Sequence, residues 1–444
     1  MLRKLFGMGK STPQQPTRNI GFHINDFNKN TFLYNSLKNN NIHGVIDYFH
    51  ALNEKKDYKK WLCPLFCDIT LFDNYERTVK PLHKIIEKNH GHYFFDMSIE
   101  AIPYYPLDSY LSKKFQSFHH MLEHHAIDPH KVYFVSANLA GDTHYDSWRN
   151  KMGVKYRIAN NIMTHQYSLG GFSEPFKQYF NKDNLFQNNL ALCEKSVTQH
   201  AKRNYYFTCL MLRPRSHRTA IMLHLMERGH VDKGMVSYFG NEFGSKDAQT
   251  VETDELTYEN ISHLPSGKRL ISQWDKLLKA SPITIDSTLK SIKEHGWASF
   301  FFPREFIEDT ASLNKRSYFE IVTETHFTDD SCLYLTEKSI WPIVSLQPFI
   351  TVGSPFTLKY LQDLGFQTFS PVIDETYDSI ADPNLRMELI MKEIDRLCSM
   401  SLTEIHDLYC SLWPRLLHNY HHYFNKSKEL AAEQIQQRIL SFIN

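Results

Sequence analysis

The 444-residue chain is too long for one ordinary hydrophobic core, so its length predicts two domains. Hydrophobic residues make up 42% of the chain and aromatic residues 14%, which excludes an intrinsically disordered protein. The formal net charge of +1 excludes a whole-molecule field that would drive binding to nucleic acid or membrane, although it leaves room for a local basic patch.

The cysteines and the N-terminal segment indicate a cytoplasmic protein. The seven cysteines are scattered and odd in number, which favours reduced thiols over a disulfide framework. Residues 1–18 are basic and polar and lack the apolar run of a signal peptide, so we expect a mobile tail. No later segment has the apolar length that a membrane span requires.

The first half of the chain alternates short apolar runs with amphipathic segments. Aromatic and β-branched residues between polar or glycine punctuation predict three strands, near residue 20, at 91–99 and at 131–139. Between the last two strands, the apolar residues of 109–125 recur at helical spacing. Strands separated by helices predict a parallel, layered α/β domain, which we assign to residues 19–190.

The same pattern restarts after about residue 200. Strands and helices alternate in the following predicted order: strand 204–212, helix 217–229, strand 235–240, strand 317–325, a helix from Thr336, strand 348–353 and helix 354–365. The last of these helices has a serine start and a glycine stop.

Three boundaries follow from this alternation. We assign residues 200–385 to a second α/β domain. The domain boundary is expected within 185–203, where we interpret the polar residues as loop-like. The chain has no strand signal after residue 384, so 386–444 are predicted to be helices that pack back on the body of the protein.

A predicted helix start at Thr336 carries the most informative polar residues. The Thr336 side chain can cap the helix, and the first turn then presents backbone N–H groups and a partial positive charge. Such a helix end suits a diphosphate, to which Lys338 would add a point charge, while Glu337 would accept hydrogen bonds from ribose hydroxyls. Pro342 should kink or shorten the helix. Taken alone, these residues fit a capped, solvated helix start better than a binding site.

The order of the neighbouring motifs changes that interpretation. Phe-x(4)-Glu at 319–324, Tyr-Leu-Thr-Glu-Lys at 334–338 and Gln-Pro-Phe-Ile-x-Val-Gly-Ser-Pro at 347–355 resemble the α1,3-fucosyltransferase family. Upstream, an arginine (Arg215 or Arg218) precedes a helix and His-Val-Asp-Lys-Gly, which looks like that family's arginine and Val-Asp-x-x-Gly block. The Thr-Glu-Lys block is also similar to glycosyltransferase-like proteins of large bacteriophages. The first half resembles no family that we can name.

The resemblance implies a GT-B-like architecture, in which two Rossmann-type α/β/α domains face a cleft and the second domain holds the donor nucleotide. It implies that Lys338 binds the diphosphate, Glu337 binds the ribose, and Tyr334 helps to shape the nucleotide pocket. Arg215 or Arg218 would neutralise phosphate charge as the leaving group departs. These roles, with the Thr336 cap, make up the predicted donor site.

Glu324 stands in the place of the glutamate in the family's Phe-Glu-Asn segment, so the resemblance makes it a catalytic candidate. The next residue is Thr325 where the family has asparagine. This departure leaves the identity of the sugar open.

The chemistry of the residues agrees with a nucleotide-diphosphate sugar donor. Breaking a sugar–phosphate bond develops negative charge on the diphosphate, which fixed cations and N–H dipoles can stabilise. Arg213, Arg215 and Arg218 lie between a predicted strand and helix, where α/β domains bind ligands; the alternative is a solvated basic loop. The sequence has no Asp-x-Asp motif, so we predict metal-independent transfer with no cofactor.

An inverting transfer also needs a general base for the acceptor hydroxyl. Asp142 and His144 follow the strand predicted to end near Leu139, and Asp146 and Asp68 are further candidates. The same segment also reads as an ordinary turn with helix-capping aspartates. The sequence does not choose the base.

Four histidines on the helix predicted at 109–125 offer a metal-binding alternative. His120 and His124 have the i,i+4 spacing of a metal pair, and with Glu123 they spell the His-x-x-Glu-His string of some zinc proteases. His119 and His125 lie on the same predicted helix. No third ligand is recognisable downstream. We therefore interpret the four histidines, His119 included, as a solvated helix face.

The leading hypothesis is a glycosyltransferase, of hexose or pentose, that acts on a hydroxyl of a glycan or of a hydroxylated base in phage DNA. Its partners would be a nucleotide-sugar donor and that acceptor, in the cytoplasm of the host if the protein is viral. The alternative is a non-catalytic nucleotide- or glycan-binding protein on a GT-B scaffold. Thr325 and the unidentified base motivate this alternative.

Overall fold

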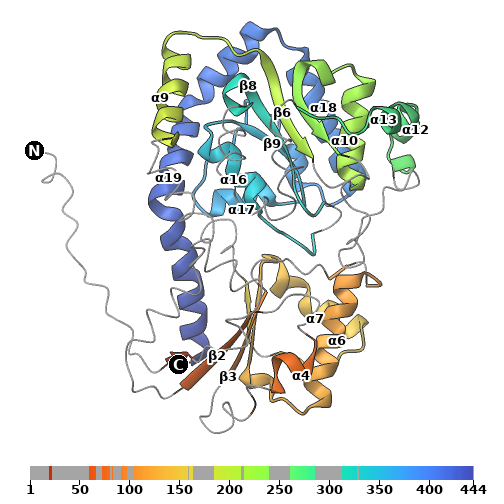
Figure 1. Ribbon diagram of the computed structural model, residues 1–444, viewed down its shortest axis with the longest axis vertical. Coiled ribbons are helices and arrows are strands. Elements are labelled where there is room, and N and C mark those ends of the chain that lie inside the picture. Colours follow the sequence, from red (N-terminus) through yellow and green to blue (C-terminus); the bar gives the residue numbers. More distant parts are fainter. Residues whose placement is uncertain are drawn as a thin grey trace, which may run out of the picture.

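The protein has a strand-and-helix layout in two halves, one above the other in Figure 1. The computed structural model describes residues 20–22, 60–66, 73–80, 83, 92–97, 104–105, 107–158, 160–163, 185–211, 215–239, 261–285, 313–327 and 330–443. Each half contains one parallel sheet, so the predicted α/β class is confirmed. The predicted tail, 1–18, lies outside the described residues.

The sheet of the first half has five parallel strands in the order of the chain. These are β1 (Ile20–Phe22), β2 (Lys60–Phe66), β3 (His92–Met97), β4 (Val132–Ser136) and β5 (Asn160–Met163). The helices described in this half are α4 (Tyr75–Thr78), α6 (Tyr110–His124), the 3-10 turn η1 (Pro129–Lys131) and α7 (Gly141–Lys151).

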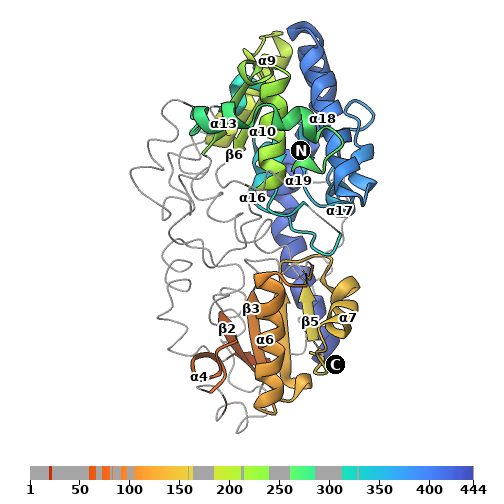
Figure 2. The same ribbon diagram turned by 90° about the vertical axis from the view of Figure 1, so that its right-hand side faces the viewer.

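The core of the first half is aromatic. Helix α6 lies against the sheet in Figure 2 and begins at the cap Ser109, whose hydroxyl accepts from the Ser112 amide at 3.2 Å. Its Phe118 ring meets Phe95 of β3 edge-on at 4.7 Å, and Phe115 lies 4.9 Å from Phe134 of β4. The apolar stripe predicted for this helix therefore faces the sheet.

The sheet of the second half has four parallel strands in the order β7-β6-β8-β9. The strands are β6 (Tyr205–Met211), β7 (Gly234–Tyr238), β8 (Ser317–Thr323) and β9 (Phe349–Val352). The helices described around it are α10 (Ser216–Glu227), η3 (Val231–Lys233), α12 (Gly267–Ile271), α13 (Trp274–Ala280), α16 (Glu337–Val344), α17 (Thr357–Asp363) and η6 (Thr376–Ser379).

Two helix ends in this half test the predicted caps. Gly229, with φ +67°, follows α10, and Gly365, with φ +93°, follows α17, so both glycine stops are present. The prediction that α17 starts at a serine was wrong, because the N-cap residue is Phe356. Ser354 donates its hydroxyl to the Cys332 carbonyl at 2.6 Å, whereas the Asp378 carboxylate accepts from the first-turn amides of α17, including Leu358 at 2.9 Å.

The segment 185–198 is not loop-like as predicted, because it forms helix α9 (Leu185–Thr198). Its Cys193 is 2% exposed and belongs to the core of the second half, and Leu190 and Val197 pack against the same core. The apolar residues of this helix are few and separated by asparagines, which explains why the sequence suggested a loop.

The end of the chain is helical, in α18 (Pro383–Ser399) and α19 (Leu402–Ile443). Helix α19 contacts α16 and β8 of the second half and β5 of the first half. Figure 1 shows it running down from the upper half to the lower sheet. One helix therefore connects the two halves. Within the described residues, every helix is too short or too polar to cross a bilayer.

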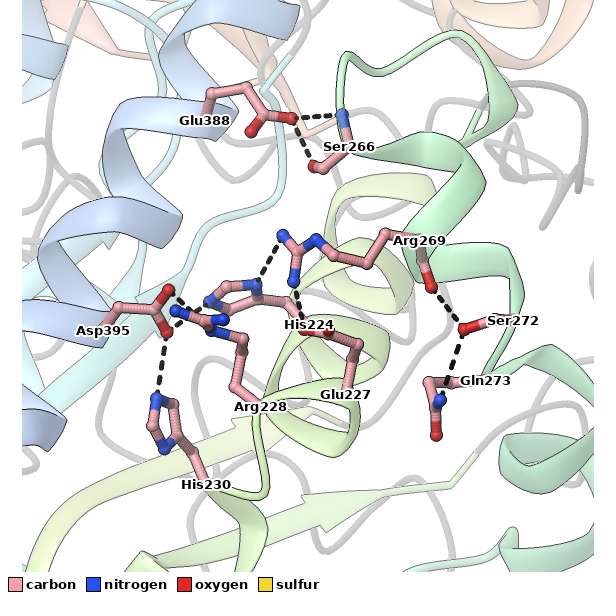
Figure 3. A network of polar contacts seen from close by, with 10 residues as sticks. All are labelled: His224, Glu227, Arg228, His230, Ser266, Arg269, Ser272, Gln273, Glu388 and Asp395. Atoms are coloured by element: carbon pink, nitrogen blue, oxygen red, sulfur yellow. Dashed lines mark hydrogen bonds and ion pairs between the residues drawn. The ribbon is translucent and has the colours of Figure 1, made fainter.

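A polar network fixes α10 against α18 (Figure 3). One oxygen of the Asp395 carboxylate accepts from His224 at 3.0 Å and from His230 at 2.9 Å, and the other accepts from Arg228 at 2.9 Å. The carboxyl end of α10 is thus held in place. The amino end of the same helix carries Arg215 and Arg218.

Candidate functional site

Helix α16 begins at Thr336, as predicted. The Thr336 hydroxyl oxygen accepts from the Lys338 backbone amide at 3.2 Å and from the Lys338 ammonium, also at 3.2 Å. Pro342 lies inside the helix, which ends at Val344 after eight residues. The Lys338 ammonium is therefore held at the amino end of α16, beside the backbone N–H groups of its first turn.

Glu324 follows β8 and holds the first turn of α16. One carboxylate oxygen accepts from the Thr336 hydroxyl at 2.6 Å and the Thr325 amide at 3.3 Å. The other oxygen accepts from the Ser339 hydroxyl at 2.5 Å and the Thr336 amide at 3.3 Å. The side chain is only 1% exposed. These contacts make Glu324 a positioning residue for α16, while its predicted catalytic role stays a prediction.

Gly353, which follows β9, leaves room for the aliphatic part of the Glu324 side chain. A Cβ atom at this position would lie 3.3 Å from Cβ of Glu324 and 3.1 Å from Cγ2 of Thr351. Both distances are tighter than ordinary carbon contacts. The Gly-x-Pro signal at 353–355 therefore has a steric reason, which is the close approach of β9 to Glu324.

The first turn of α10 binds the backbone at the end of β8. The buried Arg218 guanidinium donates to the carbonyls of Thr323 at 3.2 Å and Glu324 at 3.0 Å. His217 donates from Nε2 to the same Glu324 carbonyl at 3.0 Å and stacks on the Phe327 ring. Burial and the neighbouring arginines hold the pKa of His217 well below its usual value, so its imidazole is neutral.

His326, a partly buried residue that sequence reasoning missed, lies two residues after Glu324. Burial is the largest cause of a His326 pKa lowered to about 3. The further causes are the positive charges of Arg215, Arg218 and Lys338. Hydrogen bonds connect the same two helix starts: Arg218 of α10 donates to the Glu324 carbonyl, and the Thr336 hydroxyl at the start of α16, which binds the Lys338 ammonium, donates to the Glu324 carboxylate. The ring of Tyr334 lies 6.1 Å from that of His326.

A brace from α18 fixes the loop that carries His326. The buried Arg386 guanidinium donates to the carbonyls of Gly353, at 3.2 Å, and of Phe327, and it lies 4.5 Å from the Phe327 ring centre. No sequence motif marks this brace, because Gly353 and Phe327 lie 33 and 59 residues from Arg386 along the chain.

The first half of the chain contacts the segment that precedes Tyr334. The Asn138 side chain donates to the Ser331 carbonyl at 2.8 Å and accepts from the Leu333 amide at 3.2 Å. The Leu139 amide donates to the Leu333 carbonyl at 2.8 Å. The residues that follow β4 therefore position the segment that leads into the predicted donor site.

Three of the predicted base candidates, Asp142, His144 and Asp146, lie within α7 and not in a turn. His144 is partly buried, with Nε2 3.8 Å from an oxygen of Asp330, so it lies beside the same segment of the second half. Asp146 instead forms exposed ion pairs with Arg149 and Arg157, at 3.4 and 3.0 Å, which lower the pKa of its carboxyl.

Some predicted residues cannot be placed in this site. Arg213, Asp68 and the side chains of Asp142 and Glu337 lie outside the described residues. The structure thus brings Arg218, Thr336 and Lys338 together through Glu324 and places Tyr334 beside His326. Arg215 lies at the N-cap of α10, and His144 lies at the junction with the first half.

The interpretation of His119 as a solvated residue was wrong. Its ring is fully buried, donates to the Phe115 carbonyl at 2.8 Å and accepts from the Tyr145 hydroxyl at 2.7 Å. Burial lowers its pKa to about 4. His120 and His124 are exposed, as expected for a solvated helix face.

No family model and no curated protein matches the sequence, whereas solved structures do. The α,α-trehalose 6-phosphate synthase of Burkholderia multivorans shares 11% identity and a TM-score of 0.41, over 92% of this chain and 76% of that chain. The UDP-forming α,α-trehalose-phosphate synthase of Burkholderia xenovorans shares 8% identity and a TM-score of 0.36, over 92% and 79%. At these values neither likeness bears on chemistry or substrate.

Proposed function

We propose that the protein is a glycosyltransferase that binds a nucleotide-diphosphate sugar at the starts of α10 and α16. One observation supports the proposal most strongly: two separate helix starts bring cations to one buried residue, Glu324. Arg218 donates to the Glu324 carbonyl, and Lys338 donates to the Thr336 hydroxyl, which itself donates to the Glu324 carboxylate. Positive charge gathered at a partly buried place favours a compact polyanion. A diphosphate has that chemistry.

The arrangement also fits the departure of a nucleotide leaving group. Cleavage of the sugar–phosphate bond increases negative charge on the diphosphate, and charges fixed beforehand stabilise it without reorganisation. Arg218 is held by two carbonyls, and the Lys338 ammonium is held against Thr336, so both are preorganised. We assign Lys338 and the α16 start to the diphosphate and Tyr334 to the wall of the nucleotide pocket. The transfer proceeds without a metal in this proposal.

The acceptor approaches from the first half in this proposal. His144 lies at the junction between the halves and is the base candidate whose side chain the structure describes there. We propose a hydroxyl of a glycan, or of a hydroxylated base in DNA, as the acceptor. Salt dependence separates the two, because DNA binding weakens steeply as salt rises through counterion release.

Thermal-shift screening of nucleotides tests the donor site. We expect one nucleoside diphosphate to stabilise the wild-type protein by about 2.7 kcal/mol at a hundred times its Kd. Lys338→Ala should lose most of that stabilisation, because it removes the ammonium at the α16 start. Lys113→Ala, an exposed lysine of α6, is the matched control and should respond like wild type. Equal stabilisation of the Lys338 variant would refute the proposed donor site.

The alternative of a non-catalytic binding protein on this scaffold has one observation in its favour. Both carboxylate oxygens of Glu324, a predicted catalytic group, are engaged by hydrogen bonds to its own fold. Incubation with UDP-, GDP-, CMP- and dTDP-sugars separates the two functions. Release of nucleotide that depends on Lys338 supports the transferase, and binding without release supports the alternative.

A further inference from the structure

A cluster of three side chains with soft and borderline ligand atoms lies apart from the residues assigned to the donor. His200 stands in the segment between α9 and β6, and His406 and Cys410 lie one turn apart on α19. One ligand atom from each residue lies within 4.8 Å of the other two. We propose that these three residues bind a single zinc ion.

The ligand types and their spacing suit zinc. Zinc binds imidazole nitrogen at about 2.0–2.1 Å and thiolate sulfur at about 2.3 Å, almost always with tetrahedral geometry. Two such ligands are therefore about 3.5 Å apart. Nε2 of His406 and Sγ of Cys410 are 3.4 Å apart, so the i,i+4 spacing on α19 already sets one edge of the tetrahedron.

A neighbouring tyrosine orients the His406 ring. Its Nδ1 lies 3.3 Å from the Tyr318 hydroxyl, which also accepts from the Arg203 amide at 2.9 Å. Histidine ligands to zinc commonly donate their other ring N–H to such an oxygen. With Nδ1–H donating to Tyr318, the Nε2 lone pair of His406 faces Cys410.

The third ligand occupies an unusual backbone position. His200 has φ +50° just after the end of α9, in the left-handed region that favours glycine. The amides of Gln199 and Ala201 donate to the carbonyls of Lys195 and Ser196, both at 2.9 Å, which fixes this turn. The rings of His200 and His406 are 5.9 Å apart. The exposed His200 leaves the fourth zinc position to water.

The nearby charges are compatible with a bound cation. The Lys202 ammonium donates to the Thr403 hydroxyl at 2.7 Å, and the Arg203 guanidinium donates to the Asn314 and Ser317 carbonyls at 3.1 and 2.6 Å. Zinc binding releases the Cys410 proton to solvent, so the thiolate offsets one positive charge. The bound ion would link the segment between α9 and β6 to α19, which contacts both halves.

Cobalt(II) is the probe for this site because its spectrum reports a thiolate ligand. The full chain, with any histidine tag removed, is reduced, freed of metal and titrated with cobalt. We expect one equivalent to give a thiolate-to-cobalt charge-transfer band and intense d–d bands, and zinc to abolish both. Cys410→Ser should lose the charge-transfer band.

His200→Ala tests the site without disturbing the core, because His200 is exposed. Loss of a direct ligand should weaken zinc binding by more than about 100-fold, since even indirect partners of zinc ligands account for about 10- to 100-fold. The double variant His120→Ala/His124→Ala should bind zinc like wild type. The proposal is overturned by a wild-type titration without the thiolate band, which would leave only an S–H···N hydrogen bond. A band retained in Cys410→Ser, or unchanged affinity in His200→Ala, would overturn it equally.

Discussion

The two sheets differ at the carboxyl ends of their strands, where the two halves meet near Tyr334. In the second half, Glu324 is buried and accepts four hydrogen bonds from its own loop and from the start of α16. In the first half, Nε2 of His144 lies 3.8 Å from an oxygen of the half-exposed Asp330. Buried, fully satisfied polar networks are rigid, whereas exposed ion pairs contribute little. We call the region around Glu324 the donor edge and the region around His144 the acceptor edge. The difference indicates a donor edge that is rigid before ligand binds and an acceptor edge that remains adaptable.

Replacing Glu324 should give the largest effect, because it removes the centre of the rigid edge. Glu324→Ala leaves two buried hydroxyl donors and a buried amide without their acceptor, and each such loss costs about 1–3 kcal/mol. We expect a loss of about 3 kcal/mol or more in the free energy of unfolding, measured in urea. Asp146→Ala, which removes an exposed acid of the first half, should cost less than about 1 kcal/mol. Similar losses in both variants would contradict the contrast.

Acid should destabilise the donor edge through His326. Its folded-state pKa of about 3 lies below the ordinary value of 6.5, so the unfolded chain takes up the proton first as the pH falls. The stability is complete above pH 6.5 and decreases towards pH 3, by at most about 1.4 kcal/mol per pH unit from this residue. Urea unfolding of wild type and His326→Gln between pH 7 and pH 4 measures the difference in slope.

Pyrophosphate sharpens this test. An anion beside His326 raises the pKa of its imidazole, so the wild-type slope should become shallower. The buried His119, with a pKa of about 4, and the buried His217, whose pKa is also lowered, contribute slopes in the same direction that remain in His326→Gln. Pyrophosphate should therefore change the slope of the wild type more than that of the variant. An equal response of both proteins would show that His326 does not face the anion.

A methyl group should disturb the donor edge more than an open position of the first half. Gly353→Ala would force the new Cβ against buried Glu324 and Thr351, and overpacking of this kind costs about 1–3 kcal/mol. Gly153→Ala meets nothing within 4 Å, although its φ of +67° costs about 1 kcal/mol. Thermal unfolding compares the two variants. Nucleotide stabilisation should decrease in Gly353→Ala alone, so a decrease in both would argue against a local effect on Glu324.

The contrast also explains what the sequence could predict. Strands such as β6 and β8, and the glycine after α10, follow from local patterns that one stretch of chain carries by itself. Strand β2 was missed because Pro64 interrupts its apolar run, and β5 because only four residues, two of them asparagine, form it.

The site was predictable only in its local parts. The Thr336 cap and Lys338 belong to one short motif, so their neighbourhood was visible in the sequence. The pairing of Asn138 with Leu333 joins residues 195 positions apart, and no pattern in either segment announces it. His326 offered one usable signal, a polar ring just beyond the carboxyl end of a buried strand. Arg218 and Lys338 come close to each other only when α10 and α16 pack on the same sheet.

His144→Ala should have the smallest effect on stability and decides what the acceptor edge contributes. Its partly exposed contact with Asp330 is worth about 0.5 kcal/mol or less, so the urea midpoint should hardly change. If His144 is the general base, the transfer rate should fall about 100-fold or more while nucleotide stabilisation stays at the wild-type level. Asp330→Asn removes the charge beside His144 and keeps the imidazole, so its rate should fall much less. An unchanged rate in His144→Ala would show that another residue is the base. The first half would then contribute only by positioning the segment before Tyr334 through Asn138.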